Sequence, residues 1–276
     1  MNLPAYDSKE HNVLDYVLPN GTRVSIHQDS SSPDSTGRTI WLGAQVLAVY
    51  LHDLFGSTSA LGSTSRRGKS RQTVVDVGAG TGLVSLSLAS IGFDVLATDL
   101  GLIVDGVLGG NVSANDATLA INGTDQPRVE TKVLDWFQDP KEWTWDSDTH
   151  EDPLGAPFDL VVSADTIYDP SLSQPLLRTL HALASLSRPG QTTSSSSPPV
   201  YLALEARDPA LISAFLESAE QEWDFKCSRI DHAKIKKLVE SPQSGLGWDE
   251  SAWEGVELWK LRLRKPSAHS RRRSRP

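Results

Sequence analysis

The stretch TVVDVGAGTGLVSLSLAS, Thr73–Ser90, decides the fold of this chain. Its β-branched start predicts a strand over Thr73–Val77, and its apolar second half predicts a helix over Leu83–Ile91. Between the two lie three glycines, at positions 78, 80 and 82. Glycines in a strand-to-helix loop let a ligand approach the backbone, because no Cβ atom stands in the way. The stretch therefore predicts a binding loop at the end of a strand.

Predicted strands and helices alternate along the rest of the chain. We expect strands at Asp94–Thr98, Val129–Val133, Phe158–Ser163, Val200–Leu204, Phe225–Ile230 and Val256–Leu263, and helices at Leu102–Asn115, Leu172–Leu186 and Pro209–Gln221. Strict alternation is typical of an α/β fold, with a mostly parallel sheet covered by helices on both faces. We therefore predict one Rossmann-like domain over residues 72–264.

Residues 1–55 are expected to form an extension that packs on this domain. YVLPNGTRVSIHQ, Tyr16–Gln28, predicts a β-hairpin with Asn20-Gly21 at its turn. TIWLGAQVLAVYLHDLF, Thr39–Phe55, has apolar residues at helical spacing and predicts a helix. Residues 56–71 are polar and predict a flexible linker. The basic tail, residues 265–276, is expected to be disordered, with nuclear import or nucleic-acid contact as the alternative.

Composition narrows the function classes. The net charge is −9, so the body of the chain repels nucleic-acid phosphates and attracts basic protein surfaces. The single cysteine, Cys227, excludes an internal disulfide framework, and seven scattered histidines give no metal-ligand spacing. The N-terminal residues lack a secretory pattern, and no apolar run is long enough to span a membrane. We expect a monomer without a metal, located in the cytoplasm, the nucleus or both.

The ligand class follows from the spacing of the glycines and from two acids. A dinucleotide fingerprint would place its third glycine at position 83, which is Leu83 here, so an NAD(P)-binding oxidoreductase is disfavoured. Asp76 ends the first strand, where a carboxylate repels a pyrophosphate and suits a cation. S-adenosylmethionine carries a sulfonium and an ammonium, and Asp99 after the next strand can accept its ribose hydroxyls. The alternatives are a turn that binds nothing and, for Asp99, a helix cap.

Several motifs resemble a known family. DVGAGTGL…ATDL is similar to the seven-β-strand (class I) AdoMet-dependent methyltransferases. The Trp41 helix, VLDW at Val133–Trp136 and SADTIYDP at Ser163–Pro170 resemble methyltransferase family 16, a protein-lysine methyltransferase group. TDLG, Trp41–Ala44 and VELWKL are most similar to its methyltransferase-like 22 branch. The resemblance covers residues 41 to 263 and implies a seven-stranded sheet with S-adenosylmethionine as cofactor and S-adenosylhomocysteine as product.

The resemblance also implies roles for individual residues. Trp41 would flank the cofactor near its methionine end, and the loop of Gly78, Ala79, Gly80 and Gly82 would lie beneath it. Asp135 would lie near the exocyclic amine of adenine, Trp136 beside the ring, and Ala164 would give backbone contacts. For either tryptophan the alternative is an ordinary place in the hydrophobic core.

The chemistry implied for the family centres on Asp165 and Tyr168. A lysine ammonium has a pKa of about 10.4 and must lose a proton before its nitrogen can attack a methyl group. Asp165 could hydrogen-bond and orient the amine, and Tyr168 could line its channel. Thr166 and Ile167 stand where enzymes acting on planar amines usually have two prolines, which favours a flexible aliphatic amine. The alternative is a strand-to-helix turn capped by Asp169 or Ser171.

The sequence thus predicts methyl transfer to a lysine ε-amine of a non-histone protein. Methylation of a small amine or a nucleic acid, and a catalytically silent AdoMet-binding scaffold, remain the alternatives. The insert Gln138–Pro157 is acidic, and its side chains are expected either to attract a basic substrate protein or to form a solvated loop: Asp146, Asp148, Glu151 and Asp152.

Overall fold

A seven-stranded sheet forms the centre of the molecule, with strand order β5-β4-β3-β6-β7-β9-β8. The computed structural model describes residues 1–31, 36–61, 71–119, 126–145, 154–187 and 197–264. The strands are β3 Thr73–Val77, β4 Asp94–Asp99, β5 Val129–Val133, β6 Leu160–Ala164, β7 Val200–Glu205, β8 Phe225–Arg229 and β9 Val256–Leu263. The strands from β5 to β7 are parallel, whereas β9 pairs antiparallel with both β7 and β8. The expected α/β fold with a seven-stranded class I sheet is confirmed.

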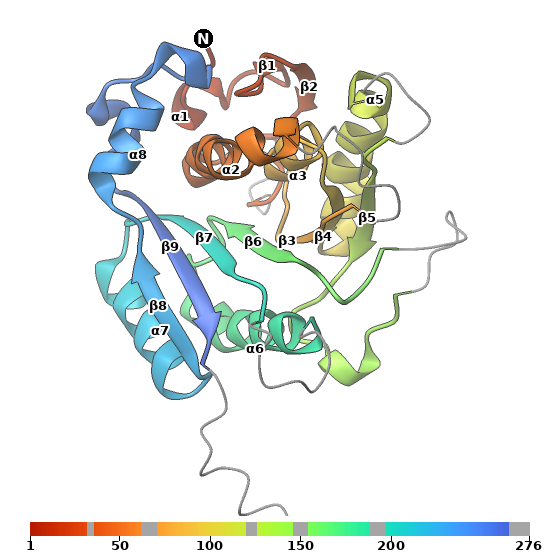
Figure 1. Ribbon diagram of the computed structural model, residues 1–276, viewed down its shortest axis with the longest axis vertical. Coiled ribbons are helices and arrows are strands. Elements are labelled where there is room, and N and C mark those ends of the chain that lie inside the picture. The colour runs from red at the N-terminus through yellow and green to blue at the C-terminus, as the bar shows by residue number, and fades with distance from the viewer. Residues whose placement is uncertain (32–35, 62–70, 120–125, 146–153, 188–196, 265–276) are drawn as a thin grey trace, which may run out of the picture.

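Helices cover both faces of this sheet (Figure 1). One face carries α2 Leu42–Leu61, α3 Leu83–Ala89 and α5 Gly109–Leu119, and the other carries α6 Pro170–Leu186 and α7 Pro209–Gln221. Along β3, Val74 packs into the core beneath α2 and α3, whereas Val75 and Val77 pack into the core beneath α6. Burial on both faces explains why the strand is a continuous apolar run interrupted only by Asp76.

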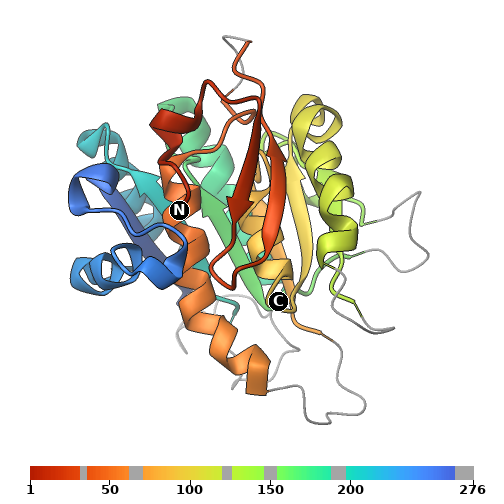
Figure 2. The same cartoon turned by 90° about the horizontal axis from the view of Figure 1, so that it is seen from above.

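The N-terminal hairpin consists of β1 Val13–Val17 and β2 Arg23–His27, as expected from its Asn-Gly turn. It lies over the layer formed by α2 and α3 (Figure 2). Two side chains of α5 pair with the free edge of β2. Asn111 accepts from His27 N at 2.8 Å and donates to His27 O at 3.0 Å, and Asn115 makes the same pair of bonds with Ser25, both at 2.8 Å. The two amides thus substitute for a neighbouring strand.

Asn2 joins the hairpin to a segment from the other end of the chain. Its side chain bonds to both Val17 N, at 2.9 Å, and Val17 O, at 2.8 Å. Its backbone N–H donates to Gly245 O at 2.9 Å, and its carbonyl accepts from Trp248 Nε1 at 2.8 Å. The last two residues follow α8, His232–Val239, so residues at opposite ends of the sequence meet on one face.

The structure corrects two of the expected boundaries. α2 continues to Leu61, so the linker expected over residues 56–71 does not begin at Gly56. The stretch contains no proline, and adding residues to an existing helix costs little compared with starting one. Sequence analysis also missed α8, and it ended the helix after β4 at Asn115 although helical structure runs from Gly101 to Leu119 through a π-helical segment at Val104–Leu108.

Several expectations concern residues outside the described ranges. These are most of the linker, the four acids of the Gln138–Pro157 insert and the basic tail. Within the described ranges, no helix combines the length and the hydrophobicity that crossing a membrane requires.

Candidate functional site

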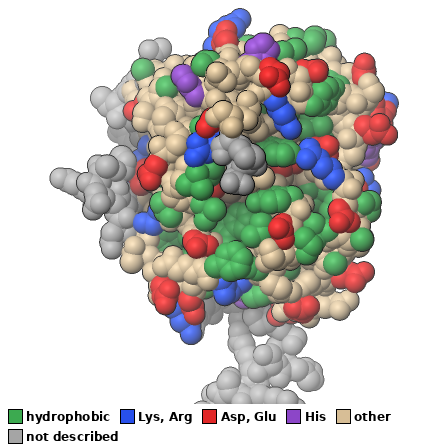
Figure 3. All heavy atoms as spheres, turned by 180° about the vertical axis from the view of Figure 1, so that it is seen from behind, with side chains coloured by type: hydrophobic (Ala, Val, Ile, Leu, Met, Phe, Trp, Pro, Cys, Tyr) green, Lys and Arg blue, Asp and Glu red, His purple; other side chains and the backbone are tan. Residues whose placement is uncertain are grey.

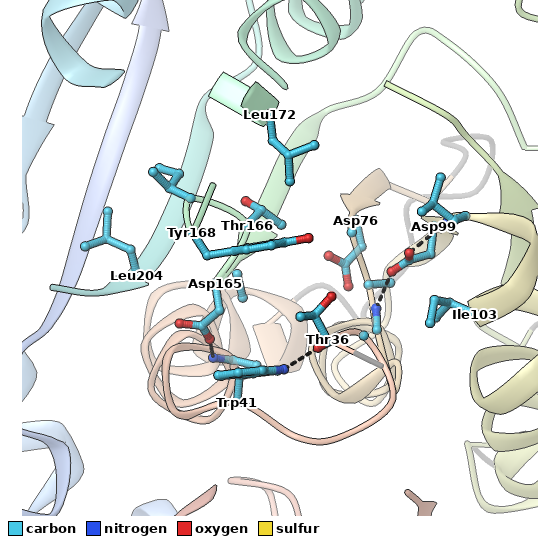
Figure 4. A pocket seen from close by; sticks show the side chains of 18 of the residues that line it. Thr36, Trp41, Asp76, Asp99, Ile103, Asp165, Thr166, Tyr168, Leu172 and Leu204 are labelled. Carbon is cyan, nitrogen blue, oxygen red and sulfur yellow. Dashed lines mark hydrogen bonds between the residues drawn. The ribbon is translucent and has the colours of Figure 1, made fainter. Parts of the chain in front are cut away.

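A cavity of about 650 Å³ opens at the carboxyl ends of the parallel strands. Loops that follow β3, β4, β5, β6 and β7 line it, together with residues that precede α2. In Figure 4, Asp165 and Tyr168 lie on one side, Asp99 and Ile103 lie on the other, and Asp76 lies between them. The structure brings these predicted residues together at its wall: Trp41, Asp76, Gly78, Ala79, Gly80, Asp99, Asp135, Trp136, Ala164, Asp165 and Tyr168.

The glycine loop follows β3 and forms part of the cavity wall. Gly78 has a φ of +73°, and a Cβ atom there would lie 2.7 Å from Thr166 Cγ2 and 3.1 Å from Trp136 Cζ2. A larger residue would therefore separate the loop from both neighbours. Gly82, by contrast, is not among the lining residues. It begins α3, and its missing side chain leaves room for Leu108, whose Cδ1 would lie 2.9 Å from a Cβ atom.

Asp76 is a carboxyl group buried beneath the cavity. Only 1% of the residue is exposed, and its Oδ2 accepts a hydrogen bond from Ser85 Oγ at 2.7 Å. Burial raises its pKa to about 7; the Ser85 bond lowers the pKa, and the nearby Asp99 charge raises it further. A cation placed beside Asp76 would stabilise its charged carboxylate and lower its pKa.

Asp99 ends β4 and ties that strand to the glycine loop. Its Oδ2 accepts from Gly80 N, and its Oδ1 accepts from Leu100 N, both at 2.8 Å (Figure 4). Burial raises the pKa of Asp99, whereas the two backbone donors lower it. Leu100, not Asp99, is the N-cap residue of the short helix that follows, Gly101–Ile103. The carboxylate is therefore placed at the cavity rather than used as a helix cap.

Asp135 and Trp136 follow β5 and complete the wall beside Asp99. Asp135 is exposed, and its Oδ1 accepts from Phe137 N at 2.9 Å, which fixes a tight turn. The turn presents the half-buried Trp136, whose carbonyl accepts a hydrogen bond of 2.6 Å from Arg178 on α6. The backbone of Trp136 is thus held from the helix side. Its indole lines the cavity and packs against the core beneath α6.

Asp165 has a second role that its sequence motif did not indicate. The residue has a φ of +55°, and its Oδ2 accepts from Ala44 N in the first turn of α2 at 3.0 Å. A Cβ atom at Gly43 would lie 2.5 Å from Asp165 Oδ1, so this contact requires glycine. Burial raises the pKa of Asp165 to about 7, against the effect of the Ala44 bond. Asp165 therefore anchors the start of α2, and Asp169 caps α6 through Ser171 N at 2.8 Å.

Trp41 precedes α2 and lies at the cavity rather than in the core. It is partly exposed, and its Nε1 donates to Thr36 O at 2.5 Å. Two cations lie over its ring: Lys9 Nζ is 4.8 Å and Arg207 Cζ is 4.9 Å from the ring centroid. Arg207 also forms an ion pair with Glu205, and both residues line the cavity. Sequence analysis missed this pair, although its position at the end of β7 was a usable signal.

Large hydrophobic side chains surround the polar residues at the cavity. Leu100, Leu102, Phe137 and Tyr168 all line it, and each is about half exposed or more. Figure 3 shows one face of the molecule, where hydrophobic side chains gather around a hollow with acidic side chains near its edge. Among the described residues, no group of three or more His, Cys, Asp and Glu side chains is arranged to hold a metal ion.

Comparison with known proteins agrees with this architecture. A family model described as lysine methyltransferase matches residues 19–222. Methyltransferase-like protein 22 of Mus musculus is 29% identical over 170 residues, which cover 58% of this chain and 39% of that protein. Protein N-lysine methyltransferase METTL21A is 32% identical over 146 residues in Mus musculus, covering 53% of this chain and 55% of that protein. The Danio rerio METTL21A is 28% identical over 183 residues, covering 66% and 71%.

The chain spans about two fifths of the length of the methyltransferase-like 22 proteins that it matches, at 39% in mouse and 38% in Homo sapiens. The family model nevertheless matches more than half of the chain, and its matched range contains the glycine loop, both strand-end acids and the Asp165–Tyr168 motif. The chain belongs to the lysine methyltransferase family.

Proposed function

We propose that the protein transfers a methyl group from S-adenosylmethionine to the ε-amine of a lysine in another protein. One observation carries the proposal: a single cavity joins the two acids at the ends of β3 and β4 to Asp165 and Tyr168 after β6. A volume of about 650 Å³ suits a cofactor of this size. The family supports the same reaction, because its model is described as a lysine methyltransferase.

The residues at the β3–β4 side fit the cofactor. Asp76 offers a buried carboxylate to a cationic ligand, Asp99 offers carboxylate oxygens to ribose hydroxyls, and Trp136 offers an aromatic face to adenine. Gly78 and Gly80 leave the loop between them free of large side chains. When bound, S-adenosylmethionine supplies an electrophilic methyl on sulfur. The chain's own contribution is to hold the two reactants in line and to exclude water.

The residues at the β6–β7 side fit an aliphatic amine. Ile167, Leu172 and Leu204 give this part of the wall apolar surface, which disfavours a charged ammonium and so favours the neutral, reactive amine. Tyr168 stands at the rim with its ring exposed. We infer that the side chain enters between Tyr168 and Trp41, beside Asp165.

The partner is proposed to be a basic, non-histone protein, met by the acidic body of a monomeric enzyme in the cytoplasm or the nucleus. A net charge of −9 supports attraction to a basic surface. The four insert acids named above would add to this attraction.

The proposal is tested by incubating the purified protein with radiolabelled S-adenosylmethionine and a cell lysate. We expect label in protein bands that protease removes and nuclease leaves, with lysine as the modified residue. Label removed by nuclease, label only in small molecules, or no label would each contradict the proposal.

Two variants separate the roles of Asp165. Asp165→Ala removes both the charge and the bond to Ala44, whereas Asp165→Asn keeps an oxygen that can accept from Ala44 N. If Asp165 orients the amine, we expect both variants to lose roughly two orders of magnitude in turnover, as typical for a residue that aids proton transfer, with nearly unchanged affinity for S-adenosylhomocysteine by calorimetry. Full activity in Asp165→Asn, or lost cofactor affinity in both, would leave Asp165 with its structural role alone.

A further inference from the structure

The side chains of Trp41, Glu205 and Arg207 form a cluster on the wall of the cavity, beside the Asp165–Tyr168 motif. The guanidinium carbon of Arg207 lies 4.9 Å from the centroid of the Trp41 ring. The same guanidinium forms an ion pair with Glu205, at the end of β7. An aromatic face combined with a carboxylate is a combination that binds ammonium groups. In this structure the guanidinium of Arg207 is the cation between the Trp41 ring and the Glu205 carboxylate.

The second cation over Trp41 has a different position. Lys9 Nζ lies 4.8 Å from the ring centroid, but Lys9 is not among the residues that line the cavity, whereas Arg207 is. Of these two cations, Arg207 is therefore the one that lies at the cavity wall together with Trp41. Lys9 carries the same charge at nearly the same distance from the same ring, which makes it a matched control.

We propose that Trp41 and Glu205 form the entry site for the ammonium group of the substrate, and that Arg207 occupies this site until the substrate displaces it. The identity of the ligand as a lysine side chain rests on the proposed function. The site itself depends only on the geometry of the ring, the carboxylate and the resident guanidinium. Arg207 would then set substrate affinity by competing with each incoming ammonium.

The side chain of Arg207 is exposed enough to move away from Trp41 and Glu205. Its side chain is 57% exposed, whereas that of Glu205 is 26% exposed, so the guanidinium can turn to solvent while the carboxylate stays at the wall. The backbone turn does not depend on the ion pair, because Arg207 N donates to Glu205 O at 2.8 Å and Ala206 N donates to Gly255 O at 2.8 Å. Exposed ion pairs contribute little free energy, so a ligand with a comparable charge can replace one.

A lysine ammonium and the neutral amine needed for attack would use different parts of the cavity. Glu205 and the Trp41 ring favour the charged form, whereas the apolar wall at Ile167 and Leu172 favours the neutral form. The substrate would dock as an ammonium at Glu205 and Trp41 and react as a neutral amine at the apolar wall, which gives it a path from the rim inward. The entry site therefore selects for a cation before chemistry begins.

The test uses n-butylammonium as the probe and binding as the readout, so that it does not depend on methyl transfer. The full chain, labelled with ¹⁵N, is titrated while the indole N–H signal of Trp41 is followed by NMR, and Trp41→Phe assigns that signal. The variants are Arg207→Met, Lys9→Met and Glu205→Gln. 1-Butanol, which is neutral and of similar size, reports binding that does not need a charge.

We expect Arg207→Met to bind n-butylammonium about threefold to fivefold more tightly than the parent chain, as release from one exposed ion pair predicts. Lys9→Met should leave the affinity unchanged, and Glu205→Gln should weaken it by at least the same factor. Unchanged or weaker binding in Arg207→Met, equal gains in both Met variants, or equal affinity for 1-butanol would overturn the proposal. Thermal unfolding confirms that each variant is folded.

These results separate the inference from the proposed function. Methylation of a lysine in the lysate without ammonium binding at Trp41 and Glu205 would reject the entry site and leave the enzyme activity intact. Ammonium binding with the expected effect of Arg207→Met, but without protein methylation, would keep the site and reject the proposed reaction.

Discussion

At the scale of single residues, the site is built from carboxyl groups at strand ends. Asp76 and Asp99 could be predicted from the sequence, because each stands where a run of β-branched and apolar residues ends. Glu205 and Arg207 could have been found by their position at the end of β7, but the contact between Arg207 and Trp41 could not. Gly43 could not be found, because its importance arises from a contact with a residue far away in the sequence. Gly43 matters because Asp165, which follows β6, lies against it.

We predict that the affinity for S-adenosylhomocysteine rises with pH. The pKa of Asp76 is about 7 in the unliganded protein, and a cationic α-ammonium beside it would favour the charged carboxylate. Below pH 7 binding must remove a proton, so the affinity should fall, by at most about tenfold per pH unit. Calorimetry from pH 5 to pH 9 should show a rise that levels off above pH 7.

Asp76→Asn should bind more weakly and lose this pH dependence, while Asp116→Asn, at an exposed position on α5, should behave as the parent chain does. A pH profile of Asp76→Asn that matches the parent profile would exclude Asp76 as the titrating group. The stability of the ligand-free protein depends on pH in the opposite direction from the ligand affinity. A raised pKa means that the folded state binds this proton more tightly than the unfolded chain, so Asp76 destabilises the fold increasingly as pH rises from about 4 to about 7.

At the scale of elements, the strands and the main helices were predictable because their hydrophobic periods are strong. β3, β5, β9 and α7 begin and end at the residues expected from the sequence. The missed helix, α8, is short, and only Ile235 and Val239 are buried in it. The attachment of the hairpin to α5 could not be predicted from the sequence either. Asparagine has a low helix propensity, and its presence in a helix does not indicate that its side chain pairs with a strand edge.

We predict that the hairpin depends on these asparagines. Asn111→Ala and Asn115→Ala each remove the bonds that a buried side-chain amide makes to the edge of β2 and should lower the free energy of unfolding by about 1 to 3 kcal/mol. Urea denaturation measures the change. Ser113→Ala, on the exposed side of α5, is the control and should stay within about 0.5 kcal/mol of the parent. Equal stability of all three variants would show that the edge contacts contribute nothing.

At the scale of the whole molecule, hydrophobic cores pack on both faces of the sheet, and the cavity lies at the carboxyl ends of its parallel strands. Topology therefore explains why residues from β3, β4, β5, β6 and β7 meet there, although they span positions 76 to 211. Sequence analysis expected this meeting from the alternation of strands and helices together with the resemblance to a known family. It did not predict how the N-terminal extension closes against the segment after α8, because no local pattern connects Asn2 with Trp248.

We predict that the Asn2 side chain stabilises the molecule by holding the N-terminal residues against the hairpin. Asn2→Ala removes both side-chain bonds to Val17 from a residue that is 7% exposed, so the free energy of unfolding should fall by about 1 to 3 kcal/mol. Glu10→Ala, at an exposed position nearby, should have little effect. Thermal and urea unfolding test both variants, and a parent-like Asn2→Ala would show that the side-chain bonds to Val17 contribute nothing.

The contact between Asp165 and the first turn of α2 has a consequence for redesign of the site. One carboxylate both faces the cavity and fastens the helix that follows Trp41. Attempts to change acceptor preference by mutating Asp165 will therefore also loosen the neighbouring wall at the start of α2. A designer should treat position 43 and position 165 as one module, since a side chain at position 43 can be introduced only if the Asp165 carboxylate moves or is replaced.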